Sequence, residues 1–290
     1  MHADDFGNTI NISKCIYKCF KNGSLNSTSI IVNSPYFKES IEFIKDEPIR
    51  KVLHLNIVEN KAVTSKNFNL LTDKNHHFYK SWQRLVFEYY CLFDKEKKAK
   101  IKEEIKEEYE NQILLYCLKM QTKEICIDSH QHTHKIPFVT DILIELIEEM
   151  NINVLNVRVT KEKFFWAIGS FCDLKNYLGI NFFVHFLLNF LSRKMIKKFD
   201  RANIKYNDAF IGVLFSGDMT LKAIEKGLEK VKDAKTVEIL FHPGQISKEE
   251  QLRFKNDQFK RWYISKNRKK EMDVLLSYDS TVKFSKVMIF

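Results

Sequence analysis

Short apolar segments rich in β-branched residues alternate with helical patterns, and this alternation limits the fold more than any other feature of the chain. The segments with the length and composition of strands are "STSIIVN", "VLHLNIV", "EICID", "VLNVRV", "AFIGVLF" and "TVEILF". Between them apolar residues recur at helical spacing, as at Ile12, Cys15, Ile16, Cys19 and Phe20. Repeated β–α units predict an α/β fold with a parallel sheet, either open or closed into a barrel.

The same pattern favours a single domain over residues 1–290, because no repeat of fixed period, low-complexity tract or linker interrupts it. Two stretches depart from the simple alternation. A helix-rich insertion is predicted at about 76–121, where interleaved charges suit an exposed helix with one apolar face. We assign His76 and His77, within it, to the surface. A basic helix is predicted near 254–276.

Composition narrows the class of protein. Hydrophobic residues make up 44% of the chain and charged residues 29%, as in ordinary globular proteins. The net charge of +10 comes mainly from dispersed lysines, which indicates a solvated surface and argues against nucleic-acid binding. The six cysteines form no CxxC pair, and no signal peptide precedes the first acidic residues. We therefore expect reduced thiols and a cytoplasmic location.

The most apolar stretch lies within about residues 176–200, predicted to be helical. Its core, "LGINFFVHFLLNFL" (Leu178 to Leu191), is shorter than the ~20 residues that a bilayer span needs, and "SRKMIKK" follows it. A buried helix or a hydrophobic lid is the simplest interpretation, with His185 as a hydrogen-bonded histidine inside it. A membrane-surface helix with a basic flank and a grip on an apolar substrate remain as alternatives.

Polar clusters follow the strand signals, where parallel α/β folds gather their functional residues. An acidic pair lies in "HADDFG" at the start of the chain, and a histidine lies in "HLNIVE". Three alternating histidines lie in "DSHQHTH" and one more lies in "FHPG". The candidate residues are Asp4, Asp5, His54, His130, His132, His134 and His242.

These residue types suit a divalent metal site. Alternating histidines on an extended segment would direct all three rings to the same side. One aspartate and two histidines around a metal leave coordination positions open for a water and a carbonyl oxygen. The second aspartate of the pair could then accept the proton of the attacking water, and an opposite histidine could protonate the leaving group.

Two other interpretations remain open at this point. An Asp/His/His set also suits a non-haem iron oxygenase, although the usual HxD pairing on one strand is absent. A carbohydrate- or lipid-binding protein without catalytic activity would instead use the apolar segment as its grip.

In their order, "ADDFG", "HLNIVE", "DSHQHTH" and "HPG" resemble the YdjC-like carbohydrate deacetylases. The likeness continues through "NGSLNSTSIIVN" and "RKKEMDVLLS", so it covers nearly the whole chain. It implies a (β/α)-barrel-like fold, a distorted TIM barrel with helical insertions. It also implies one divalent metal ion, Mg²⁺ or Zn²⁺, and hydrolysis of N-acetyl groups on carbohydrate substrates.

The resemblance also implies roles for individual residues. Asp5, His54 and His130 match the family's metal ligands, and Asp4 matches its catalytic base. His242 is the candidate general acid.

Three further residues are candidates for contact with substrate. These are His132, His134 and Arg158, with a structural or surface role as the alternative for the arginine.

The beginning of the chain departs from the family pattern. Family members carry a short apolar strand before the acidic pair, whereas here only Met1, His2 and Ala3 precede Asp4. If the chain begins at Met1, we expect the first strand to be missing, which would expose two neighbouring strand edges. A start upstream of Met1 is the alternative.

Overall fold

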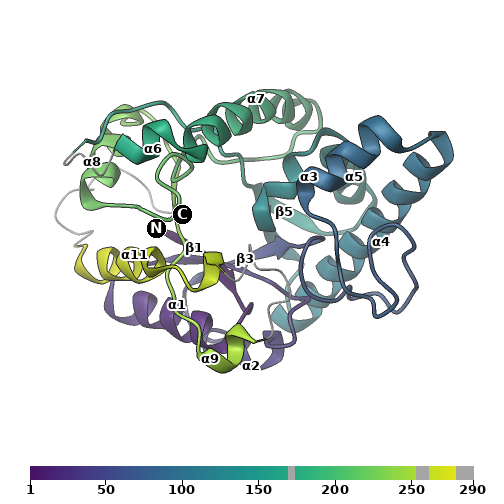
Figure 1. Cartoon of the computed structure of the whole chain (residues 1–290), viewed down its shortest axis with the longest axis horizontal. Coiled ribbons are helices and arrows are strands. Elements are labelled where there is room, and N and C mark those ends of the chain that lie inside the picture. The colour runs from purple at the N-terminus through teal and green to yellow at the C-terminus, as the bar shows by residue number, and fades with distance from the viewer. Residues whose placement is uncertain (169–173, 253–260, 279–290) are drawn as a thin grey trace.

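A sheet of seven parallel strands forms the centre of the protein, in the order β5-β4-β3-β2-β1-β7-β6 (Figure 1). The computed structural model describes residues 1–168, 174–252 and 261–278. The strands are β1 (His2–Phe6), β2 (Ser27–Ile30), β3 (Arg50–Leu55), β4 (Glu124–Ser129), β5 (Asn153–Val157), β6 (Ala209–Ile211) and β7 (Val237–Phe241). This architecture confirms the predicted α/β, distorted TIM-barrel-like fold.

The two edge strands of the sheet approach each other. Val157 at the end of β5 forms an isolated parallel bridge with Tyr206, just before β6. The backbone N–H of Phe210 in β6 donates to the carbonyl of Lys161, 3.1 Å away. The sheet therefore curls round toward closure, with only a few hydrogen bonds across the seam.

Helices surround the sheet, and they include the predicted insertion and the predicted apolar segment. Figure 1 shows α1 and α11 side by side on one side of the molecule, with α7 on the opposite side. The helices are α1 (Ile10–Asn22), α2 (Phe37–Ile41), α3 (Trp82–Phe87), the π-helical η1 (Glu88–Leu92), α4 (Lys95–Met120), the 3₁₀ helix η2 (His130–Lys135), α5 (Pro137–Glu149), α6 (Lys175–Leu178), α7 (Ile180–Arg201), α8 (Leu221–Lys230), α9 (Lys248–Gln251) and α11 (Lys266–Ser277). The predicted insertion thus contains α3, η1 and α4. The predicted apolar segment contains α6 and α7.

The expectation of a missing first strand is wrong. The acidic pair lies inside β1 itself, and the residues just before it pair with both neighbouring strands. His2 and Ala3 pair with Ser27 and Thr28 of β2, and with Leu240 and Phe241 of β7. Because β1 is hydrogen-bonded on both sides, the middle of the sheet has no open edge here.

The five cysteines in the described part of the chain are free thiols, while Cys172 lies outside the described residues. Of the predicted C-terminal helix, the structure describes α11, and residues 253–260 lie outside the described range. No helix among the described residues is long and apolar enough to cross a bilayer.

Candidate metal centre and active site

An irregularity in β1 turns both aspartates toward one site. The register with β2 shifts between Ala3 and Phe6, and Asp5 has a left-handed φ of 73°. Consecutive side chains of a regular strand point to opposite faces, so an undistorted strand would separate the two carboxylates. A left-handed non-glycine residue costs on the order of 1–3 kcal/mol. Here Asp4 Oδ2 and Asp5 Oδ1 each lie 4.0 Å from His54 Nε2.

His54, on β3, is held in one orientation by a neighbouring strand. Its Nδ1 lies 2.5 Å from Asp128 Oδ1 on β4, where His54 and Asp128 are register partners. This bond leaves Nε2 facing the two carboxylates of β1. His54 Nε2 is buried and has no hydrogen-bond partner among the described residues.

His130 begins η2, directly after β4, and lies between two carboxylates. Its Nδ1 is 3.2 Å from Asp5 Oδ1, and its Nε2 is 3.2 Å from Glu59 Oε2. Burial alone would lower the pKa of His130, but Glu59 and Asp5 together raise it to about 10. The two carboxylates therefore favour a positive charge at the position of His130.

Asp5, His54 and His130 together have a geometry that suits a metal ion. One ligand atom from each residue lies within 4.8 Å of the others, and all three side chains are buried. Although burial opposes ionisation of Asp5, the hydrogen bond from His130 and the charge of Arg268 hold its pKa well below the usual range. An ionised carboxylate, an unpartnered imidazole nitrogen and a second imidazole are suitable ligands for a divalent cation.

Asp4, unlike Asp5, is paired with the buried Arg158. Arg158 Nη1 and Nη2 donate to Asp4 Oδ2 and Oδ1 at 2.9 and 2.8 Å. Burial opposes the charge of Asp4, but Arg158 and His54 hold the pKa of this carboxyl well below its usual range. His242 Nε2 lies 3.9 Å from Asp4 Oδ2, and burial lowers the pKa of His242 to about 4.

The three histidines of "HQHTH" do not point to the same side, so the expectation of an extended segment is wrong. They belong to η2, in which Gln131 and His132 adopt left-handed backbone angles. The ring of His132 contacts that of Phe210 edge-on. His134 is fully buried. Its ring nitrogens lie 2.5 Å from Ser129 Oγ and 2.9 Å from the carbonyl oxygen of Arg158.

Arg158 lies beneath the site, where its guanidinium contacts three carboxylates. Besides Asp4, it lies 2.5 Å from Asp128 and 2.6 Å from Glu238. Only 2% of the residue is exposed. Arg158 therefore pairs with carboxylates of three strands, and its contact with substrate stays a prediction.

Sequence reasoning missed the carboxylates that support the histidines. Asp128 stands two residues before His130 and Glu59 ends "HLNIVE", so both were in the quoted motifs without an assigned role. Arg268 of α11 was missed as well, and its Nη1 lies 3.1 Å from Asp5 Oδ2. Nothing local in the sequence relates Arg268 to Asp5, because 263 residues separate them.

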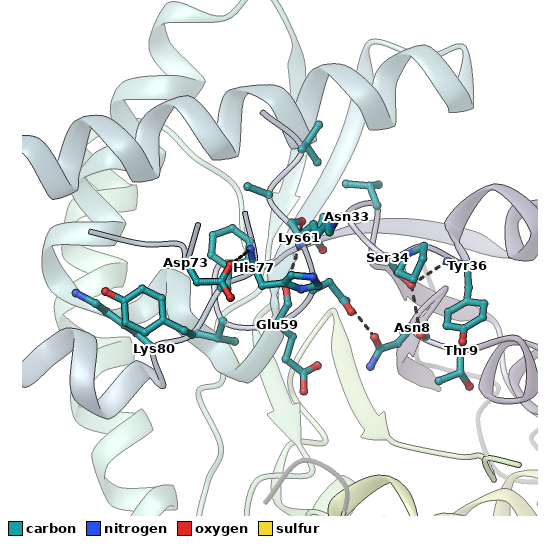
Figure 2. A pocket seen from close by; sticks show the side chains of 18 of the residues that line it. Asn8, Thr9, Asn33, Ser34, Tyr36, Glu59, Lys61, Asp73, His77 and Lys80 are labelled. Atoms are coloured by element: carbon teal, nitrogen blue, oxygen red, sulfur yellow. Dashed lines mark hydrogen bonds between the residues drawn. The ribbon is translucent and has the colours of Figure 1, made fainter. Parts of the chain in front are cut away.

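A cavity of about 950 Å³ adjoins this centre, with Glu59 in its lining. Figure 2 shows Asn8 and Ser34 on one side of Glu59, and His77 and Lys80 on the other. His77, assigned to the surface from the sequence, is half-buried and lines this cavity. Amide, hydroxyl and charged groups in a cavity of this size provide the hydrogen-bonding partners that a polar ligand needs.

We expect Asp128→Asn to weaken metal binding by roughly 10–100-fold, the usual effect of removing a partner that orients a histidine ligand. The substitution replaces the charged acceptor of the His54 Nδ1–H group with a neutral amide, so the ring of His54 is held less firmly. Competition with a chromophoric chelator measures the affinity. Asp141→Asn, an exposed carboxylate on α5 that pairs with Lys198, is the matched control. Unchanged affinity in Asp128→Asn would contradict the orienting role.

Known proteins resemble this chain over most of its length. The sequence profile of the family described as YdjC-like protein matches residues 1–283. A carbohydrate deacetylase of Clostridium beijerinckii is 28% identical over 68% of this chain and 70% of its own length. One of Brevibacillus brevis is 23% identical over 85% of this chain and 81% of its own.

Two further matches differ in how much they cover. A carbohydrate deacetylase of Thermoanaerobacter pseudethanolicus is 28% identical, and the chain spans 61% of its length. A crystal structure from Enterococcus faecalis, of a protein provisionally assigned to cellobiose-phosphate cleavage, has a TM-score of 0.63 at 19% identity. It covers 95% of this chain and 89% of the other, so the likeness extends to the whole fold.

Proposed function

Because this chain belongs to the YdjC-like protein family, we propose that it is a metal-dependent hydrolase that removes N-acetyl groups from an amino sugar, an oligosaccharide or a glycoconjugate. The observation that carries the proposal is the buried cluster of Asp5, His54 and His130 beside Asp4. It supports the proposal because amide hydrolysis needs an activated water, a polarised carbonyl and a nearby proton acceptor.

Asp5, His54 and His130 would hold the metal ion. When bound, a divalent cation polarises the acetyl carbonyl oxygen and lowers the pKa of a water molecule. Two histidines and one carboxylate suit zinc, whereas magnesium prefers more oxygen ligands. Asp128 and Glu59 would keep the two rings turned toward the ion.

Asp4 is the proposed proton acceptor. The guanidinium of Arg158 holds its carboxylate in place and keeps it ionised. Since the same pairing makes Asp4 a weak base, a proton taken from water leaves it readily. His242, neutral at its lowered pKa, lies 3.9 Å away and can receive that proton. It then carries the proton needed by the departing amine.

The cavity beside Glu59 is the proposed position of the sugar. Its lining offers amide, hydroxyl and lysine groups that suit ring hydroxyls and the substituents of an acetylated carbohydrate.

Acetate release is the test of the proposed reaction. The protein, stripped of metal by a chelator and dialysed, is incubated with a panel of N-acetylated sugars while Zn²⁺, Mg²⁺ and other divalent ions are added singly. We expect no acetate without metal and a return of activity with at least one ion, since the water depends on the metal for its acidity.

Two outcomes would contradict the proposal. Oxygen-dependent turnover that requires iron and never releases acetate would favour an oxygenase. Sugar or lipid binding that is equally tight with and without metal, again with no acetate released, would favour a binding protein.

A further inference from the structure

The solvent-facing side of α7 is apolar in a way that the proposed reaction does not explain. Phe183, Phe186, Leu187 and Phe190 lie on it at helical spacing, and 68% of Phe183 is exposed. The helix also begins with an exposed Ile180. Exposed apolar residues scattered singly are normal, but a contiguous group of this size marks an interaction surface.

The opposite side of α7 is already in use inside the protein. Leu188 packs with Phe210 of β6, and Met195 and Phe199 belong to the main core. His185 Nδ1 lies 2.8 Å from the buried Glu162, which confirms the expected hydrogen-bonded histidine. The exposed aromatic residues therefore cannot turn inward without removing this side of the helix from the core.

Neighbouring segments extend the apolar surface beyond α7. Trp166 is 59% exposed, and its ring packs edge-on against Phe164. Phe164 in turn contacts Phe182, which contacts Phe186. Leu178 of α6 is 79% exposed, and it follows Tyr177, whose ring packs with those of Phe164 and Trp166. Trp166, Leu178, Ile180, Phe183, Phe186, Leu187 and Phe190 are called the α7 patch below.

Cations continue the same side of the helix after the apolar residues end. Arg193, Lys194 and Lys197 follow Phe190 at helical spacing and are exposed. Within the described part of the chain none of the three forms an ion pair. Lys194 Nζ lies 4.5 Å from the centre of the Phe190 ring. From Phe183 to Lys197 the face runs about 20 Å along the helix axis.

We propose that the α7 patch and these three cations bind the surface of an anionic lipid bilayer. A helix whose aromatic stretch is followed on the same side by cations can lie on a membrane interface. Its rings then enter among the acyl chains, while the long lysine and arginine side chains reach back to the phosphates. Tryptophan is enriched at this depth. A protein partner could cover apolar residues equally well, but the row of unpaired cations matches a dense anionic surface. This inference does not depend on the deacetylase proposal.

Vesicle flotation tests the proposal on the full chain. We expect the protein to float with vesicles of phosphatidylcholine and phosphatidylglycerol. With vesicles of phosphatidylcholine alone, we expect it to stay in the bottom fraction of the gradient. The triple variant Arg193→Gln, Lys194→Gln, Lys197→Gln should lose roughly 100-fold in affinity for the anionic vesicles. The variant Phe186→Ser, Phe190→Ser should lose at least as much affinity for the vesicles, because it removes two aromatic rings whose transfer from water into the bilayer favours binding.

The control is Leu114→Ser, Leu118→Ser. It also removes two exposed apolar side chains, but they belong to α4 and not to the α7 patch. It should bind vesicles like the parent protein. Failure of the parent to float, equal binding to neutral vesicles, or an equal loss in the α4 control would overturn the proposal. Self-association in sedimentation equilibrium that the Phe186/Phe190 variant abolishes, without vesicle binding by the parent, would assign the patch to a second copy instead. Circular dichroism verifies that each variant is folded.

Discussion

Asp4→Asn is expected to lower kcat by roughly 10²–10⁴-fold while metal binding is kept, because the amide cannot accept the proton of the attacking water. The substitution preserves the shape of the side chain and removes one charge. It also leaves Arg158 with one partner fewer, although Asp128 and Glu238 still contact the guanidinium. Acetate release under metal saturation gives kcat, and chelator competition gives the metal affinity.

The matched control for Asp4→Asn is Glu238→Gln. Glu238 pairs with Nε of the same guanidinium, 2.6 Å away, so this variant reproduces the weakened ion pair without touching Asp4. We expect it to keep kcat within about tenfold of the parent, since it removes no proton acceptor from the site. A full kcat in Asp4→Asn would exclude Asp4 as the base. An equal loss in both variants would show that the intact arginine network, rather than proton transfer, is what matters.

Asp5→Asn is expected to abolish metal binding, with activity lost in consequence. The neutral amide is a much poorer ligand than the carboxylate, and the effect should exceed the roughly 10–100-fold typical of losing an outer partner of a ligand. Asparagine is the appropriate replacement because it tolerates the left-handed backbone of Asp5 better than alanine does. Equilibrium dialysis against Zn²⁺ and Mg²⁺ measures the bound metal.

Asp4→Asn serves as the comparison for this metal measurement, since it changes the adjacent carboxylate and is expected to bind metal normally. Thermal unfolding without metal separates loss of a ligand from loss of the fold. Undiminished metal binding by Asp5→Asn would remove Asp5 from the ligand set. Reduced binding by both variants alike would indicate a site that both carboxylates share.

The fold class followed from local patterns alone. Strand-like segments with β-branched residues, separated by amphipathic helices, admit few architectures other than a parallel sheet covered by helices. The motifs after the strands also pointed to the correct edge of the sheet, because the carboxyl ends of parallel strands lie together. Asp5, His54 and His130 accordingly meet in the structure.

Local patterns misled where backbone geometry departs from regular structure. The alternation of histidines in "HQHTH" predicts one common side, but left-handed angles at Gln131 and His132 send the rings apart. The short beginning of the chain predicted a missing strand, but the acidic pair itself forms β1 between two neighbours. Such angles depend on contacts with distant residues, which local propensity does not include.

The sequence by itself therefore determined the α/β architecture, the family and the residue types available for a metal site. Only the tertiary structure decided which partner each of the two aspartates has. The irregularity in β1 turns Asp4 and Asp5 to one site, where Asp4 pairs with Arg158 and Asp5 pairs with His130 and Arg268. The physical reason is that a buried carboxylate stays charged only beside a partner, and here the arginine partners of both aspartates lie more than a hundred residues away along the chain.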